Sequence, residues 1–147
     1  MTGHPEYAVQ ETVEADHLPH LMELFASAWW MSDRTTDDVT RMLRESDLVL
    51  ALIHTPTNRL AGFARVLTDY TYLAMVLDVI VDNNLRAQGL GATLMDAIVE
   101  DPRLTGVRSI ELVCQPDLIP FYRRWGFTDQ VGNSRLMRRT ADPRLTT

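Results

Sequence analysis

Apolar positions along the chain follow two spacings, and the two-residue spacing predicts the strands. Alternating or continuous apolar runs bounded by Gly, Pro, Asn or Asp are typical of strands. Such runs lie over residues 6–13, 47–54, 60–68, 72–82 and 107–114. The run 72–82 is almost continuously apolar, which indicates a strand buried on both faces. A closing hairpin of two further strands, over 127–131 and 135–139, is expected around Gly132 and Asn133.

Apolar residues spaced three and four apart predict four helices, over 17–28, 35–45, 89–100 and 117–125. Thr36 can cap the second helix and Asp117 the fourth. The predicted order is β-α-α-β-β-β-α-β-α-β-β. Its strand–helix–strand unit implies a parallel pair with a right-handed crossover, and the earlier hairpins imply antiparallel neighbours. We therefore expect one α/β domain, residues 1–147, around a mixed sheet.

The loop between the apolar strand and the third helix has the composition of an anion-binding turn. Arg86 precedes Gly89 and Gly91, at the point where the helix begins. Glycines let a ligand approach the backbone, and the free N–H groups of a helix start carry partial positive charge. The pattern indicates a phosphate or pyrophosphate site to which Arg86 adds a charged contact. The alternative is a helix-initiating turn that only packs closely.

Composition narrows the choice of ligand. All 14 basic residues are Arg, which excludes a Walker A loop and a lysine Schiff base with pyridoxal phosphate, since both need Lys. A Rossmann fingerprint needs a third glycine where this chain has Leu94. A net charge of −6 argues against nucleic acid as a partner, and no apolar run is long enough to span a membrane.

The same composition gives expectations about the compartment. A single cysteine, Cys114, excludes an internal disulfide and fits a reducing cytoplasm. The first ten residues have no basic or apolar segment of a signal peptide. We expect a cytoplasmic protein, and basic positions filled by Arg alone suggest a GC-rich bacterial genome.

Two motifs together resemble one family. The apolar run 79–81 followed by Arg86-x-x-Gly89-x-Gly91 resembles the acyl-CoA-binding motif of the GCN5-related N-acetyltransferases (GNAT). The segment PFYRRWGF at 120–127 resembles the F-Y-x-x-x-G-F segment of that family. The likeness covers residues 47–139 well and the first 45 residues only in the order of their elements.

The resemblance implies a GNAT-like fold and acetyl-CoA as co-substrate, without a metal. The coenzyme A pyrophosphate would lie on backbone N–H groups near Arg86 and the Thr93 hydroxyl. The residues that supply these N–H groups are Gln88, Gly89, Leu90, Gly91 and Ala92. Ile80 and Val81 would pair with the pantetheine arm, and the Ile80 N–H would polarise the thioester carbonyl. The helix that contains Phe121 would flank the arm on its other side.

Tyr122 matches the general acid of the family, and a phenol can protonate the thiolate that leaves acetyl-CoA. The base that deprotonates the amine is left open. Asp78 interrupts an apolar strand, where burial would raise its pKa toward that of a useful base. A two-residue loop at Tyr70-Thr71 would instead place Phe63 opposite Asp78 and Arg65 diagonal to it, which predicts an ion pair. Glu111 on the next strand is the second candidate base, and a water chain is the third.

Trp29, Trp30 and Arg34 follow the first helix, where this family forms part of the acceptor wall. An aromatic wall would suit an apolar or cationic acceptor. The alternative is packing of the two rings beside a solvated Arg.

The sequence therefore predicts an enzyme that acetylates a primary amine of a small molecule by direct attack in a ternary complex. A protein or peptide N-acetyltransferase and a non-catalytic acyl-CoA sensor are the alternatives. Enzymes of this fold often dimerise, so a homodimer is a further hypothesis.

Overall fold

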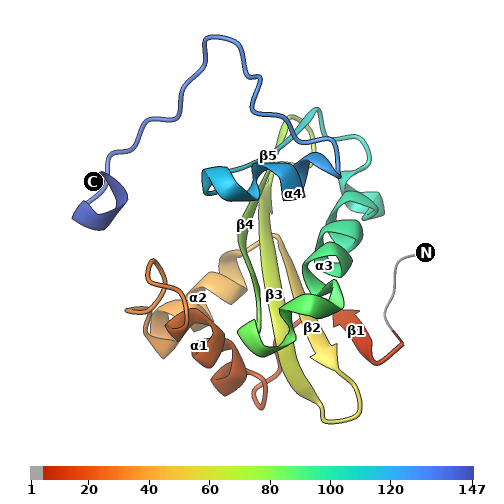
Figure 1. The fold of residues 1–147 in the computed structure, drawn as a ribbon. Helices are drawn as coiled ribbons and strands as arrows, with labels where there is room; N and C mark the ends of the chain where they lie inside the picture. Colours follow the sequence, from red (N-terminus) through yellow and green to blue (C-terminus); the bar gives the residue numbers. More distant parts are fainter. Residues whose placement is uncertain (1–4) are drawn as a thin grey trace.

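A five-stranded sheet forms the centre of the molecule in the computed structural model, which describes residues 5–147 apart from the side chains of Arg86 and Ala87 (Figure 1). The strands lie in chain order: β1 (Tyr7–Gln10), β2 (Leu48–His54), β3 (Arg59–Thr68), β4 (Leu73–Val81) and β5 (Ser109–Leu112). Neighbours from β1 to β4 are antiparallel, and β4 and β5 are parallel. The expected mixed sheet is confirmed.

Helices cover both faces of this sheet (Figure 1). The helices α1 (Leu18–Ala26) and α2 (Thr36–Glu45) cover one face, and α3 (Leu90–Val99) covers the other together with the short α4 (Ile119–Arg123). Two apolar cores result, which we call the α1/α2 core and the α3 core. Thr35, one residue before the expected Thr36, caps α2, because its hydroxyl accepts the Asp38 N–H at 3.2 Å. No helix of residues 5–147 is both long and apolar enough to cross a membrane.

The turn between β3 and β4 is longer than the predicted two residues. Its loop residue Asp69 accepts three backbone N–H groups on one carboxylate oxygen, at 2.7–3.1 Å, from Thr71, Tyr72 and Leu73. The longer loop and a bulge in β4 shift the register, so that Phe63 lies opposite Ile80 and not opposite Asp78. Asp78 lies in this irregular stretch with φ of +57°, a conformation that Asp tolerates better than most side chains.

The predicted closing hairpin over 127–131 and 135–139 is wrong. No strand follows β5 in the described chain, and Leu136 and Met137 are exposed. These two apolar residues are adjacent in sequence, so they cannot share one face of a strand. The segment instead crosses over the end of the sheet toward α1 (Figure 1), where the Arg144 guanidinium donates to the Trp29 carbonyl at 3.0 Å.

Candidate active site

The parallel strands β4 and β5 pair over only part of their length. Leu73–Val76 lie opposite Ser109–Leu112, and the second half of β4 has no strand beside it on that edge within residues 5–147. The separation begins next to the Asp78 bulge, which turns the direction of β4. Beyond Val76 this edge of β4 has no strand partner in the described chain, and we call this separation from β5 the gap. An extended ligand could pair with the backbone there as an added strand.

The direction of the backbone groups in β4 corrects the predicted role of Ile80. The Asp82 N–H donates to the Ala61 carbonyl of β3 at 2.9 Å. Because N–H groups of alternate residues point to the same side of a strand, the Ile80 N–H also points toward β3. Val79 and Val81 direct their N–H groups to the opposite side, into the gap. Pairing of Val81 with the pantetheine arm stays a prediction, and Val79, in place of Ile80, has its N–H on the side where a thioester carbonyl would lie.

Gly89 ends the short helix η1 (Asn83–Gln88) and immediately precedes α3. Its φ of +72° favours glycine, and a Cβ atom there would meet no atom within 4 Å, so the turn faces open space. The start of α3 leaves the N–H groups of Leu90, Gly91 and Ala92 without acceptors inside the helix. This turn has the geometry predicted for a pyrophosphate site.

Two predicted contacts of this turn differ in their outcome. The Thr93 hydroxyl donates to the Gly89 carbonyl at 3.3 Å, so it stabilises the turn itself. The side chain of Arg86 lies outside the described part of the structure.

The need for glycine at position 91 is explained by packing as well as by the close approach of a ligand. A Cβ atom at Gly91 would lie 3.3 Å from Cζ of Phe121, so the ring of α4 rests directly on the first turn of α3. The Trp125 indole N–H donates to the Asp96 carboxylate of α3 at 2.7 Å, which fixes the two helices together. Phe121 was predicted to flank the pantetheine arm, and the structure places its ring beside the glycine turn, a contact that was not predicted.

Tyr122 is buried in the α3 core, and its ring contacts Phe121 at a centroid distance of 5.0 Å. Burial, with a smaller contribution from Cys114, raises the pKa of Tyr122 to about 12, so the phenol is protonated at neutral pH. Its hydroxyl has no hydrogen-bond partner among the described residues. Every fully buried side-chain nitrogen or oxygen of those residues has a hydrogen-bond partner, so the unpaired Tyr122 hydroxyl must be in contact with solvent. An accessible, protonated phenol fits the role of a general acid.

Asp78 lies between two arginines on the α1/α2 side. Arg34 donates to both carboxylate oxygens, at 2.8 and 3.1 Å, and Arg65 donates through Nε at 2.7 Å. Burial raises the pKa of Asp78, but the hydrogen bonds and charges of Arg34 and Arg65 together hold that pKa below its ordinary value. A carboxylate that is harder to protonate is a weaker base, so the geometry favours the ion-pair alternative.

Glu111 has a different environment. Its neighbours Ile110 and Leu112 pack against the α3 core, so Glu111 extends from the opposite face of β5. It is exposed and accepts the Ser109 hydroxyl at 3.0 Å. Glu111 and Asp78 therefore belong to the same side of the sheet, but among the described side chains only Asp78 has arginine partners.

Trp29 and Trp30 are 50% and 42% exposed, and their rings meet edge to face at 5.6 Å. Neither ring is part of the core. Arg34, five residues after Trp29, packs its guanidinium 4.7 Å from the centre of the Phe25 ring while it binds Asp78. The loop predicted as an acceptor wall thus joins the Asp78 cluster through Arg34.

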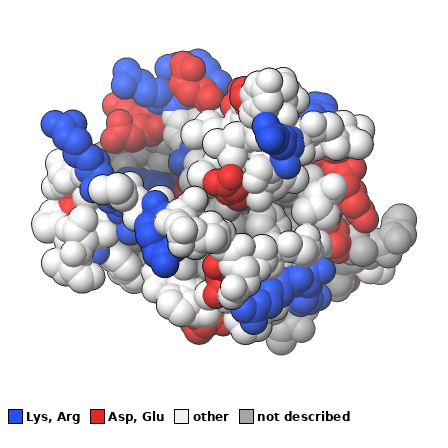
Figure 2. Space-filling model, turned by 90° about the horizontal axis from the view of Figure 1, so that it is seen from above, with Lys and Arg blue, Asp and Glu red and all other residues white. Residues whose placement is uncertain are grey.

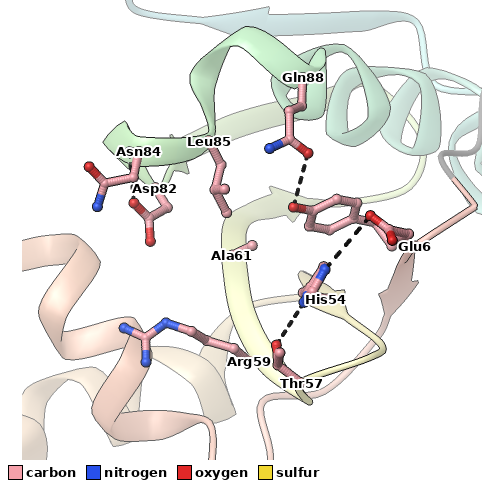
Figure 3. A pocket seen from close by; sticks show the side chains of 10 residues that line it. Glu6, His54, Thr57, Arg59, Ala61, Asp82, Asn84, Leu85 and Gln88 are labelled. Atoms are coloured by element: carbon pink, nitrogen blue, oxygen red, sulfur yellow. Dashed lines mark hydrogen bonds and ion pairs between the residues drawn. The ribbon is translucent and has the colours of Figure 1, made fainter.

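One contact of the glycine turn could not be read from the sequence. The Tyr7 hydroxyl of β1 donates to the Gln88 side chain of η1 at 3.2 Å, although 81 positions separate them. A cavity of about 320 Å³ lies beside this contact (Figure 3). It is lined from η1, from the start of β1 and from the turn between β2 and β3, as the labelled Gln88, Glu6 and Thr57 show. No sequence motif connects these segments.

Comparison with known proteins gives the same assignment as the two motifs. Residues 14–127 match the model of the acetyltransferase (GNAT) family. The chain is 31% identical over 121 residues to GCN5-related N-acetyltransferase 1, chloroplastic, of Arabidopsis thaliana, a match that covers 82% of this chain and 61% of the relative. It is 31% identical over 123 residues to serotonin N-acetyltransferase 2, chloroplastic, of Oryza sativa, with the same coverage of 82% and 61%. The chain thus spans about three fifths of the length of these relatives.

A crystal structure of a GNAT-family protein from Xanthomonas campestris superposes with a TM-score of 0.78 and 29% identity, covering 95% of this chain and 96% of the other. Among residues 5–147, no group of three or more His, Cys, Asp or Glu side chains is arranged to hold a metal ion. The fold, the glycine turn and the family match agree, and the chain belongs to the acetyltransferase (GNAT) family.

Proposed function

We propose that this chain is an N-acetyltransferase that moves an acetyl group from acetyl-CoA to a primary amine of a small molecule. The observation that carries the proposal is the gap between β4 and β5, which lies beside the open turn at Gly89. The gap offers strand backbone to a pantetheine arm, and the turn offers N–H groups to a pyrophosphate. The family match supports acetyl-CoA as the donor.

The reaction proceeds by direct attack in a ternary complex. The amine nitrogen attacks the thioester carbonyl carbon, a C–N bond forms, and the C–S bond breaks with its electron pair remaining on sulfur. The Val79 N–H stabilises the negative charge that develops on the carbonyl oxygen. Tyr122 then donates its phenolic proton to the departing thiolate. Burial that raises the pKa of Tyr122 would also raise that of a thiol bound beside it, which keeps the transfer feasible.

The amine must lose a proton before or during the attack. Asp78 has a lowered pKa and two arginine partners, so it is a poor acceptor for this proton. Glu111 is an exposed carboxylate on the same side of the sheet, without an arginine partner among the described residues. We assign the role of base to Glu111, directly or through water.

A small amine is favoured by the exposed Trp29 and Trp30, whose faces can cover an apolar or aromatic acceptor. The relative named as a serotonin N-acetyltransferase is consistent with an acceptor of that size. A polypeptide acceptor is the second candidate. The observation in its favour is the exposed apolar side chains of Leu67, Leu73 and Val113, on or next to β3, β4 and β5.

Calorimetric titration with acetyl-CoA tests the donor, with 3′-dephospho-CoA and ATP as controls. We expect saturable binding of acetyl-CoA and none of ATP. An acceptor screen that detects the free thiol of coenzyme A then compares small amines with short peptides. Acetyl-CoA binding without turnover of any amine would favour a sensor, and no binding by the folded protein would overturn the proposal.

A further inference from the structure

The cluster of Arg34, Asp78 and Arg65 contains two positive charges and one negative charge. Each guanidinium group carries one positive charge and only hydrogen-bond donors. Asp78 is nearly buried, with 8% of its side chain exposed, whereas Arg34 and Arg65 retain 25% and 16%. One arginine would suffice to neutralise the carboxylate, so the second leaves a net positive charge on the side of the sheet that faces α1 and α2.

The two arginines differ in the donors that remain available. Arg34 uses both terminal nitrogens on Asp78, and its Nη1 also lies 3.9 Å from the sulfur of Met42. Arg65 uses only Nε. Its Nη1 and Nη2 have no hydrogen-bond partner among the described residues. Every fully buried side-chain nitrogen or oxygen of those residues has a partner, so Nη1 and Nη2 must be in contact with solvent. Two adjacent N–H-bearing nitrogens in one plane match the oxygen atoms of a carboxylate or phosphate.

The cluster lies next to the reacting centre of the proposed function. Asp78 directly precedes Val79, whose N–H faces the gap between β4 and β5. Arg34 belongs to the same loop as Trp29 and Trp30. Figure 2 shows the molecule from above the view of Figure 1. This surface has a hollow, and basic side chains lie within it. Because Asp78 adjoins Val79, an amine bound at the thioester would lie near the two arginines of the cluster.

We propose that the acceptor carries an anionic group, a carboxylate or a phosphate, in addition to its primary amine, and that Arg65 binds this group. The inference rests on the proposed function and narrows its substrate class. Arg34 and Asp78 position Arg65, because Asp78 accepts from Nε and leaves Nη1 and Nη2 available to the anionic group. The anionic group takes no part in bond making or breaking, so the chemical steps of acetyl transfer are those of the proposed function.

Matched pairs of amines test the proposal with the full chain and saturating acetyl-CoA. Tyramine is compared with tyrosine, and ethanolamine with O-phosphoethanolamine, by release of free thiol. We expect kcat/KM for one anionic member to exceed that of its neutral partner by about tenfold or more, as a charge-assisted contact would give. The two pairs distinguish a carboxylate from a phosphate. Equal or better use of the neutral member in both pairs would overturn the inference.

Substitutions test whether Arg65 causes the preference for the anionic amines. Arg65→Gln is expected to remove most of the preference while acetyl-CoA binding is unchanged, and Arg65→Lys to retain part of it. Arg103→Gln, an exposed arginine paired with Asp101 and Glu11, is the matched control and should leave the preference intact. If Arg65→Gln does not fold, the preference of the wild-type protein for the anionic amines and its reduction in Arg65→Lys still test the inference. An equal loss for both members of a pair would mean that Arg65 has only a structural role.

A binding measurement separates this inference from the proposed function. If neither pair is acetylated, the protein saturated with coenzyme A is titrated calorimetrically with the same four amines. Tighter binding of an anionic member, reduced by Arg65→Gln, supports the inference without turnover. Absence of any anionic preference in binding overturns it. Failure of acetyl-CoA itself to bind would overturn the proposed function first.

Discussion

The two faces of the sheet build their parts of the site by different means. On the α3 face, the glycine turn, the ring of Phe121 and the buried Tyr122 depend on backbone conformation and on packing. On the α1/α2 face, the corresponding feature is a group of charged side chains, Arg34, Arg65 and Asp78, from a loop and two strands. Under the proposed function, the first face binds the co-substrate through backbone N–H groups. Under the further inference, the second face recognises the charge of the acceptor.

This difference implies that substitutions on the two faces should alter different quantities. Changes in the turn or in α4 should affect acetyl-CoA binding or the chemical step. Changes in the charged cluster should affect acceptor choice and the stability of the fold, because a buried ion group that loses one partner leaves an uncompensated charge. The following substitutions test that separation, from the largest expected effect to the smallest.

Gly89→Glu should abolish acetyl-CoA binding. The φ of +72° disfavours any side chain, and a carboxylate would place negative charge where the pyrophosphate belongs. We expect affinity to fall by on the order of a thousandfold, measured by calorimetry. Gly132→Glu is the matched control, since Gly132 also has a positive φ of +67° and open space around it, but lies far along the chain from the turn. Unchanged affinity in a folded Gly89→Glu protein would contradict the site.

Tyr122→Phe should lower kcat by about 10²–10⁴-fold while acetyl-CoA binding changes little. The substitution keeps the ring that packs in the α3 core and removes only the hydroxyl. Because the pKa of Tyr122 is about 12, the wild-type rate should show no decline from phenol ionisation between pH 7 and pH 10. Tyr72→Phe, at an exposed ring, is the control. A variant with wild-type kcat would exclude Tyr122 as the acid.

Asp78→Asn should reduce the free energy of unfolding by about 3 kcal/mol, because it leaves two partly buried guanidinium groups without their anion. The pKa of Asp78 is lowered in the folded state, so its stabilisation is complete above the unfolded value of about 3.9 and is lost as the pH falls through the folded value. The difference between wild type and variant, measured by urea denaturation, should therefore narrow below about pH 4.

The control for this measurement is Asp129→Asn, which breaks the exposed pair with Arg123 and should cost less than about 1 kcal/mol. An Asp78→Asn protein as stable as wild type would show that the cluster contributes charge but not stability. It would also weaken the contrast between the two faces.

The sequence was most informative where the chemistry lies in one contiguous segment. The run from Val79 to Gly91 contains the strand, the turn and the helix start, so local spacing predicted the turn that the structure contains. The contact of Phe121 with this turn joins two segments 30 positions apart, and local spacing did not predict it. The error at Ile80 arose because the direction of an N–H group depends on the bulge and on the turn between β3 and β4, and neither was evident from apolar periodicity.

The sequence was less informative where side chains from distant segments meet. The pairing of Arg65 with Asp78 was anticipated as one alternative, but the participation of Arg34 depends on where the loop after α1 lies against β4. The closing hairpin failed for a related reason. Turn residues at Gly132 and Asn133 suggested it, but the adjacent Leu136 and Met137 give no single apolar face to pack on the sheet.

Tyr7→Phe should produce the smallest effect and tests whether the turn on the α3 face depends on side chains at all. The Tyr7 hydroxyl donates to Gln88 at the end of η1, and burial, with smaller contributions from Glu6 and Asp82, raises the pKa of Tyr7, so the donor stays protonated. Loss of one neutral hydrogen bond of about 1 kcal/mol corresponds to a rise of about twofold to fivefold in the Kd for acetyl-CoA. The ring that contacts His54 is retained, so the free energy of unfolding should fall by no more than about 1 kcal/mol, the value of the lost hydrogen bond. A Kd equal to that of wild type would mean that the backbone conformation at Gly89 forms the turn without this side-chain contact. The α3 face would then depend on backbone and packing, and the α1/α2 face on charged side chains.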